Sequence, residues 1–234
     1  MKYQYQRFGV WSGIAFFFLF FLAMVLAGVI PPPSPTLTPS ELMAKMQGNH
    51  AGIGVGMQLG YIAAILLVPW SAVISLQLAR IEGPQPMMAI TAFGVGVANA
   101  VAFYMPFIFW SGAFYRADQN PELMRFLNDV TWLEFVMLYS PFALQTLIIA
   151  VVGLSDKSAT PTFPRWFCFL SVWVSILVIP GGFAFFFQQG PFAWNGLIAF
   201  WIPVTVFTIY FCAFVPLLFK AIKRQEMENA EAAK

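Results

Sequence analysis

The sequence contains few charged residues, one histidine and two cysteines. Only 9% of its 234 residues are charged, against about 25% in soluble domains. His50, the sole histidine, excludes a haem held by two histidines of one chain and a histidine-rich di-iron centre. Cys168 and Cys212 lack the spacing of metal ligands, and no histidine is placed to activate a serine. We therefore expect no cofactor and no catalytic centre of the chain's own; an enzyme would need a borrowed metal or cofactor.

Hydrophobic residues make up 60% of the chain and are concentrated in long runs. Six runs are long enough to cross about 30 Å of hydrocarbon as helices. Every run except the first contains a proline, which predicts kinked helices. We expect an all-α, multi-pass protein with short loops, a single transmembrane domain over residues 1–224 and a charged, fraying tail at residues 225–234. The expected spans are residues 8–30, 53–78, 87–114, 130–154, 166–187 and 192–219.

Lysine and arginine are distributed unevenly between the two ends of these spans. With a cytoplasmic N-terminus, nine lie on the inside and three on the outside, which predicts that both termini are cytoplasmic. The basic residues are scattered at membrane edges, so we expect membrane lipids and no nucleic acid as partners. The inside set is Lys2, Arg7, Arg80, Lys157, Arg165, Lys220, Lys223, Arg224 and Lys234, and the outside set is Lys45, Arg116 and Arg125.

Glu134 is the one carboxylate that the apolar sequence carries into a span. Asn120 can cap the helix that leads to it, and Pro121 suits the first turn of that helix. A charge at the centre of a span costs about 2.5–3.5 kcal/mol, so Glu134 should face protein or water. It is either a proton-titrating or cation-attracting site, or a shallow side chain that is hydrogen-bonded to a neighbouring helix or paired with Arg116 or Arg125.

Neutral polar residues extend this seam. Helical spacing places Glu134 and Gln145 on one stripe, and Asn99 can donate a hydrogen bond to Gln58 or Gln145. Kinked helices around a shared interior either enclose a ligand cavity or are purely structural. The 27 Phe, 8 Trp and 11 Met favour an apolar or amphipathic ligand over a bare ion, although they also suit a surface that faces lipid. The candidate ligand-binding residues are Glu134, Asn99, Gln145, Ser140, Tyr139 and Gln58.

Small residues predict where helices approach closely. Gly52, Gly56 and Gly60 are spaced by four and share one face of the second span. The first span carries phenylalanine on every side, so we expect it to face lipid or another subunit. Before the second span, Thr38 and Glu41 form a capping box for a short helix at residues 39–47, which could lie on the membrane or close the outer mouth.

Three segments carry a resemblance to known sequences. They are PPPSP at residues 31–35, FPRW at residues 163–166 and GPFAWNGLIAF at residues 190–200. Together they resemble an uncharacterised group of bacterial six-span membrane proteins, and the likeness extends over most of the chain. The resemblance implies a location in the bacterial inner membrane and brings no activity with it.

Two hypotheses of function follow from the sequence. The leading hypothesis is a non-catalytic accessory or scaffold subunit that packs through its glycine face and first span. It predicts a homo-oligomer or a larger membrane complex. The alternative is a carrier or binding protein for a small apolar or amphipathic molecule, held in a cavity between kinked helices.

Overall fold

The computed structural model describes residues 2–46, 48–115 and 120–233, and these residues contain helices and no strand. The all-helical prediction is therefore confirmed for this part of the chain. Several helices follow one another within a single crossing. The eleven helical segments are α1 (Lys2–Leu26), α2 (Pro39–Met46), α3 (His50–Ile65), α4 (Leu67–Glu82), α5 (Met87–Tyr115), α6 (Pro121–Met137), α7 (Ser140–Ser155), α8 (Arg165–Leu177), η1 (Ile179–Phe186), η2 (Leu197–Trp201) and α9 (Ile202–Glu231).

Six stretches of the described chain are helical, long and apolar enough to cross a membrane. They coincide with the six expected runs, so the protein is a multi-pass membrane protein. Large apolar side chains such as Phe18, Ile62 and Ile90 remain exposed on the outside of the bundle, where lipid tails would cover them. The stretches are Tyr3–Leu26, His50–Glu82, Met87–Tyr115, Pro121–Ser155, Arg165–Phe186 and Leu197–Glu231.

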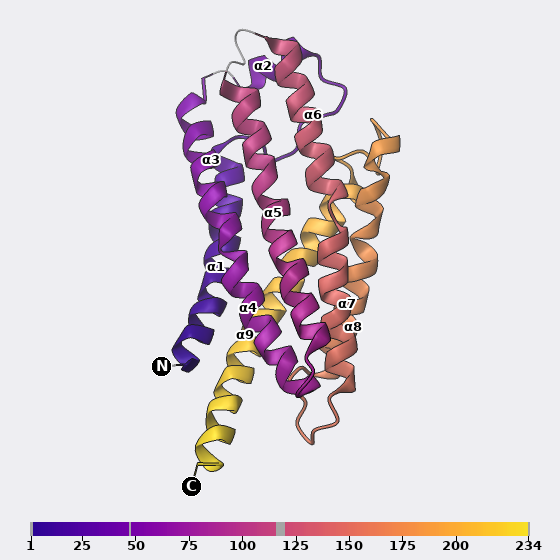
Figure 1. Cartoon of the computed structure of the whole chain (residues 1–234). Helices are drawn as coiled ribbons and strands as arrows, with labels where there is room; N and C mark the ends of the chain where they lie inside the picture. Colours follow the sequence, from indigo (N-terminus) through magenta and orange to yellow (C-terminus); the bar gives the residue numbers. More distant parts are fainter. Residues whose placement is uncertain (1, 47, 116–119, 234) are drawn as a thin grey trace.

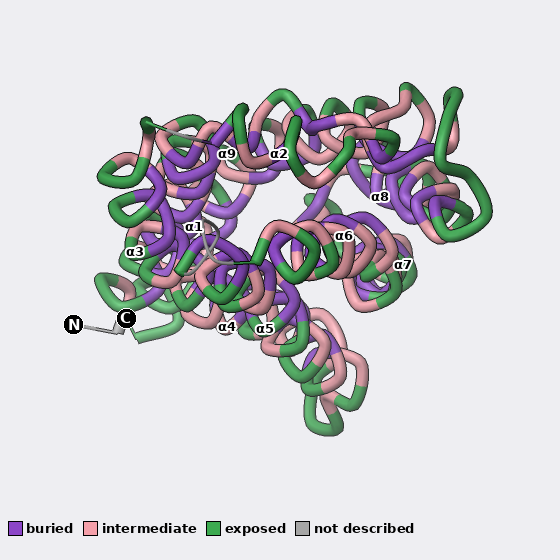
Figure 2. Tube along the Cα trace, turned by 90° about the horizontal axis from the view of Figure 1, so that it is seen from above, coloured by how far each residue is buried: buried purple, intermediate pink, exposed green. Residues whose placement is uncertain are grey.

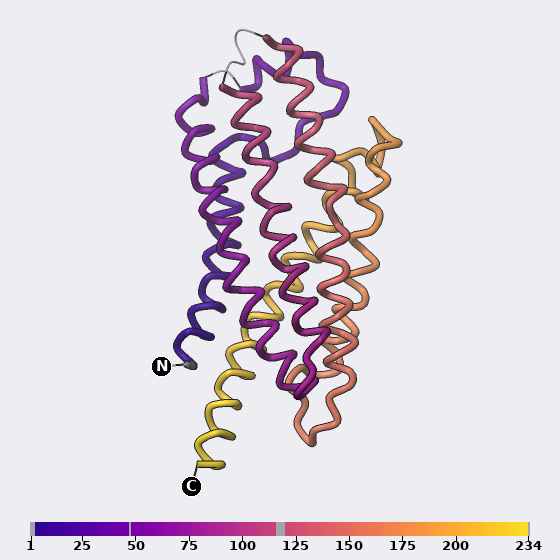
Figure 3. The backbone as a smooth tube through the Cα atoms, viewed as in Figure 1, coloured from indigo at the N-terminus to yellow at the C-terminus, as the bar shows by residue number. Residues whose placement is uncertain are grey.

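The crossings form an elongated bundle with both termini at one end, here called the terminal end (Figure 1). The short helix α2 and the start of α6 lie at the opposite, distal end. Seen from above, buried residues face the middle of the bundle and exposed residues face outward (Figure 2). Helix α9 runs obliquely across the bundle and projects beyond it at the terminal end (Figure 3).

Prolines coincide with several breaks between helices. Helix α3 ends at Ile65, just before the segment with Pro69, and α6 ends at Met137, just before Pro141. Pro180 stands in the first turn of η1, where the 3-10 segment replaces α8. By contrast, Pro106 and Pro216 lie inside continuous helices. A proline removes one helical hydrogen bond, and neighbouring contacts decide whether the helix ends there.

The first span does not face lipid or another subunit on all sides, because nearly half of it is buried inside the bundle; what covers its exposed side stays a prediction. Helix α1 packs against α3, α4 and α9. Phe16 and Phe20 are buried in the core, whereas Phe8 and Phe18 are exposed. Gly9 and Gly13 allow the approach, because a Cβ at either position would collide with α4. This close pair of glycines is visible in the sequence and could have indicated the packing.

The glycines of the second span also pack inside the chain. A Cβ on Gly52 would lie 2.7 Å from the carbonyl oxygen of Leu26, and a Cβ on Gly56 would lie 2.6 Å from that of Ala23. Both belong to α1. A Cβ on Gly60 would collide with the ring of Phe107 in α5. The three glycines therefore hold α3 against α1 and α5 of the same molecule.

The C-terminal segment is helical and contacts other helices in the described residues, while its fraying in solvent stays a prediction. Helix α9 continues to Glu231. The Arg80 guanidinium of α4 lies 2.7 Å from the Glu228 carboxylate, and Arg7 of α1 lies 2.7 Å from Glu226. Three helices are thus joined by polar contacts that fix the last turns of α9.

The predicted capping box of α2 is confirmed. The backbone N–H of Thr38 donates to Glu41 Oε2 at 2.8 Å, and the Glu41 N–H donates to Thr38 Oγ1 at 3.3 Å. The Thr38 backbone N–H and the Thr38 hydroxyl, which also donates to Glu41 Oε2 at 2.8 Å, hold the pKa of Glu41 below its usual value. Leu42 and Met46 are buried, and α2 packs against α6. The predicted end at Gln47 lies outside the described residues.

Candidate functional site

A buried amide pair lies between α5 and α7. The Asn99 Nδ2 donates to Gln145 Oε1 at 3.1 Å, which is one of the two hydrogen bonds expected for Asn99. Gln145 Nε2 donates to the backbone carbonyl of Ala92 at 3.0 Å and lies 3.5 Å from Ser71 Oγ of α4. Both amide side chains are buried. The cluster thus links three helices at one depth of the bundle.

Gly96 makes room for this cluster. A Cβ at that position would collide with Ser71 Oγ and would lie 2.6 Å from Gln145 Nε2. The glycine lets the Gln145 amide cross the surface of α5 and reach the Ala92 carbonyl. Its neighbour Gly94 meets nothing within 4 Å, because it faces outward.

The hydrogen bonds determine how the amides are oriented. Gln145 must direct its nitrogen at the Ala92 carbonyl, so its oxygen is left to accept from Asn99. Asn99 must then use its nitrogen, and its own amide oxygen finds no hydrogen-bond partner among the described residues. Asn99 lines both cavities, and its oxygen is free to accept a hydrogen bond.

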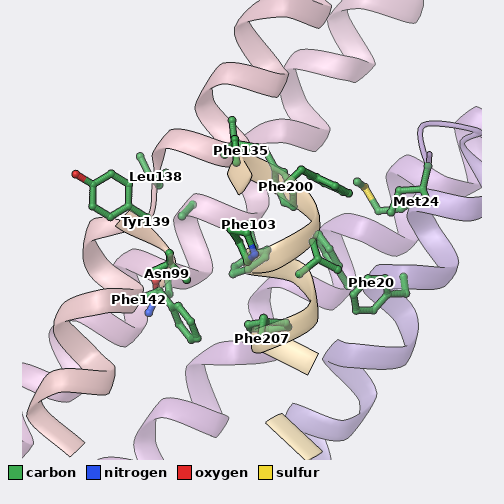
Figure 4. Close-up of a pocket in the computed structure, with 18 residues that line it drawn as sticks. Phe20, Met24, Asn99, Phe103, Phe135, Leu138, Tyr139, Phe142, Phe200 and Phe207 are labelled. Atoms are coloured by element: carbon green, nitrogen blue, oxygen red, sulfur yellow. The ribbon is translucent and has the colours of Figure 1, made fainter. Parts of the chain in front are cut away.

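The larger of two cavities has a volume of about 110 Å³ and is partly open. Figure 4 shows side chains from α1, α5, α6, α7, η2 and α9 converging on it. Its walls are almost entirely apolar, and the polar side chains in the lining are Asn99 and Tyr139. No charged side chain of the described residues lines it. The aromatic lining includes Phe20, Phe103, Phe135, Phe142, Phe200 and Phe207.

A second cavity of about 30 Å³ lies beside the first. Trp70, Phe211 and Phe214 contribute apolar walls. Its polar lining is richer than that of the larger cavity. The two cavities share Asn99, Phe103, Phe142 and Phe207, and the polar residues of the smaller one are Ser71, Asn99, Gln145, Thr146 and Tyr210.

Irregular helix borders the larger cavity. Ala199 and Phe200 belong to the π-helical turn η2, and Val178 lies between α8 and the 3-10 segment η1. Non-α turns leave backbone groups that neighbours must satisfy at membrane depth, and π turns are frequent at functional sites. Here the N–H groups of Ile198 and Ala199 both bond to the carbonyl of Pro191.

Glu134 lies apart from both cavities. The predicted start of its helix is confirmed, since Asn120 Oδ1 accepts a hydrogen bond from the Leu123 N–H at 3.0 Å and Pro121 begins α6. The Glu134 Oε2 is buried without a hydrogen-bond partner in the described residues, and Arg125 lies 3.8 Å from Asp129. The other suggested partner, Arg116, lies outside the described residues. Glu134 and Gln145 sit on different helices, because the chain breaks between α6 and α7.

Of the six candidate residues, Asn99, Gln145 and Tyr139 line the cavities. Ser140 and Gln58 are exposed and lie outside the cavity lining. Gln58 therefore does not join Asn99, because it occupies the outward face of α3. Sequence reasoning missed Ser71, Gly96 and Thr146. Gly96 could have been found from the sequence, because it is a small residue that lies one helical turn before Asn99.

No protein-family model, no curated protein and no solved structure matches the chain. Function is therefore inferred from the two cavities and the residues that line them.

Proposed function

We propose that this protein is a membrane-embedded binding protein or carrier for a small, mainly apolar molecule that carries one hydrogen-bond donor. The observation that supports the proposal is the aromatic cavity with the unpartnered Asn99 oxygen in its wall. Apolar walls favour an apolar body by about 25 cal/mol per Å² removed from water. A hydroxyl or N–H of the ligand would donate to the Asn99 oxygen, which accepts no hydrogen bond from the described residues.

The cavity limits the size and charge of the ligand. At about 110 Å³, it is comparable to an engineered cavity of about 150 Å³ that takes benzene. One ring or a short alkyl chain would fill it, and a longer molecule could extend through the open side. A charged head would find no opposite charge in the lining, so a neutral molecule is favoured.

The scaffold hypothesis is weakened at the glycine face that suggested it, because α1 and α5 cover this face of α3. Nearly half of α1 is buried against the rest of the bundle, and its other side remains exposed. A scaffold role would need another surface of the bundle. We place the carrier in a bacterial inner membrane with both termini in the cytoplasm, on the basis of the uneven basic residues and the sequence resemblance.

Photolabelling of the purified protein in lipid nanodiscs would test this proposal. The probe is a hexanol that carries a diazirine, and labelled residues are mapped by mass spectrometry in the presence and absence of excess hexanol. Ala102 lines the larger cavity, so Ala102→Leu fills it. Ala98 stands one turn earlier in α5 and is exposed, so Ala98→Leu is the matched control.

We expect the probe to label cavity residues and excess hexanol to suppress this labelling. Ala102→Leu should reduce the labelling about tenfold, which corresponds to about 1.4 kcal/mol of binding free energy. Ala98→Leu should leave the labelling unchanged. Labelling spread evenly over lipid-facing residues, with no effect of Ala102→Leu, would overturn the proposal. A stable complex with another protein and no competed labelling would favour the scaffold instead.

A further inference from the structure

The two cavities are separated by very few side chains. Phe103 of α5, Phe142 of α7 and Phe207 of α9 line both cavities, together with Asn99. The ring of Phe207 lies between the other two, with ring centroids 6.0 Å from Phe103 and 5.5 Å from Phe142. Apart from Asn99, the residues that the two cavities share are therefore aromatic, and their rings come from three different helices.

The two cavities differ in polarity. Asn99 and Tyr139 are the polar residues of the larger cavity, whereas the smaller one shares Asn99 and adds Ser71, Gln145, Thr146 and Tyr210. A volume of about 30 Å³ accommodates a water or a group of similar size, since a water needs roughly 10–15 Å³ of such space and two to four polar partners. A ligand hydroxyl meets the same requirement.

We propose that the smaller cavity is an inner subsite for the neutral polar end of the ligand, and that Phe103, Phe142 and Phe207 form a gate that controls access to it. The proposal rests on the function proposed above and adds the direction of the ligand: polar end inward, apolar body in the larger cavity. An amphipathic alcohol or phenol has this chemistry, because its hydroxyl can donate a hydrogen bond to the Asn99 oxygen. Its polar end would lie near Ser71 and Gln145.

The positions of the gate residues in their helices allow the rings to move. Phe142 stands in the first turn of α7, directly after the break at residues 138–139. Phe207 stands in the second turn of α9, shortly after the π-helical turn η2. Near such breaks a small change in backbone dihedrals can redirect a ring without disturbing a whole helix.

Two photoreactive hexanols distinguish this subsite from simple binding in the larger cavity. One carries the diazirine beside the hydroxyl, and the other carries it at the far end of the chain. In the wild-type protein we expect the first to label Ile149 and Tyr210, which line the smaller cavity alone, and the second to label Val136 and Ala199, which line the larger cavity alone. Excess hexanol should suppress both patterns.

Phe207→Leu keeps an apolar side chain but replaces the ring with a smaller group, so the two cavities are less separated. We therefore expect the first probe to label residues of the smaller cavity about threefold more, or by about 0.6 kcal/mol. Phe142→Leu should act in the same direction and serves if the first variant does not fold. Phe18→Leu is the control, because Phe18 is 69% exposed on α1.

If both probes label the larger cavity alone in the wild type and in the gate variants, the proposal of an inner subsite is wrong, while the proposal of ligand binding in the larger cavity stands. If neither probe gives competed labelling, the proposed function is wrong as well.

Discussion

At the scale of single residues, the amide pair of Asn99 and Gln145 depends on a glycine that neither residue reveals. Gly96 is buried beneath the Gln145 amide, where a methyl group would occupy the space of Ser71 Oγ. Two hydrogen bonds of Gln145 cross this point. Any side chain there must push the amide away from the Ala92 carbonyl, which would leave buried polar groups unpaired.

We therefore expect Gly96→Ala to destabilise the protein by about 1–3 kcal/mol, the usual cost of overpacking. Gly94→Ala is the matched control: Gly94 lies two residues away in α5, is exposed and has no atom within 4 Å of an added Cβ. The measurement is the Tm of both variants in detergent, where about 1 kcal/mol corresponds to roughly 2–4 °C in a chain of this size. Equal Tm values for the two variants would contradict the inferred packing.

Asp156 lies outside the membrane spans and fixes the loop between α7 and α8. Its burial would raise the pKa, but hydrogen bonds from the backbone N–H groups of Thr162 at 2.8 Å and Ser158 at 3.0 Å lower the pKa of this carboxyl below its ordinary value. A lowered folded pKa stabilises the fold above the unfolded pKa of about 3.9, and this contribution is lost as the pH falls through the folded pKa.

We expect Asp156→Ala to cost about 1 kcal/mol at pH 7, because the carboxylate accepts two hydrogen bonds in a partly exposed position. The Tm difference from the wild type should shrink below pH 4 as the wild-type carboxyl is protonated. Lys157→Ala, at the exposed neighbouring position, should show no such pH dependence. A difference of the same size at pH 7 and pH 3 would show that the charge of Asp156 contributes nothing.

Sequence rules predicted the amide pair but not its surroundings. A polar residue in a span needs a polar partner, which led from Asn99 to Gln145. The same rule also suggested Gln58, because one sequence does not show which face of α3 points inward. Ser71 and Gly96 belong to the site only through the packing of α4, α5 and α7, and that packing is a tertiary property.

At the scale of helices, local chemistry was a sound guide to where segments begin. The capping box of α2 and the Asn120 cap of α6 follow from hydrogen bonds between neighbours in sequence. The irregular turns η1 and η2 were not predicted, because proline and glycine permit many local conformations. The contacts of the tail were missed for another reason: its partners lie on α1 and α4, far away in the sequence.

Those partners make the end of α9 testable. Arg80 Nη1 donates to Gln77 Oε1 and Nη2 donates to Glu228 Oε2, each at 2.7 Å, so Arg80→Met removes the ion pair between α4 and α9. We expect amide hydrogen exchange in residues 225–231 to become about tenfold faster, as docking is lost and local opening becomes easier. Gln77 would also lose a partner, although it keeps its hydrogen bonds to α1 and α9.

The control for this variant is Arg224→Met. Arg224 lies 2.6 Å from the same Glu228 carboxylate but stands one turn earlier on α9, so its loss leaves the link to α4 intact. An exposed i,i+4 pair contributes only about 0.3–0.5 kcal/mol. Equal exchange rates in the two variants would mean that Arg80 does not hold the tail.

At the scale of the whole molecule, the bundle brings both termini to one end and places the cavities between the helices. The loops joining α4 to α5 and α7 to α8 lie at the terminal end, while α2 lies at the distal end (Figure 1). Hydropathy alone predicted the six crossings, since each apolar run must satisfy its own backbone hydrogen bonds in lipid. It could not predict that α1 lies against three other helices, because a run with phenylalanine on every side does not indicate which side is covered.

The orientation of this bundle in the membrane follows from its charges. Basic residues gather at the terminal end, so that end should face the cytoplasm. In a variant with Cys168→Ala and Cys212→Ala, a single cysteine is introduced at Lys45 in α2 or at Ala230 in α9, both exposed positions. A membrane-impermeant maleimide should label Lys45→Cys in intact cells and Ala230→Cys only after the membrane is opened. The reverse pattern would show that the bundle, and with it the open side of the cavity, has the opposite orientation in the membrane. Labelling of both positions in intact cells would refute six membrane crossings.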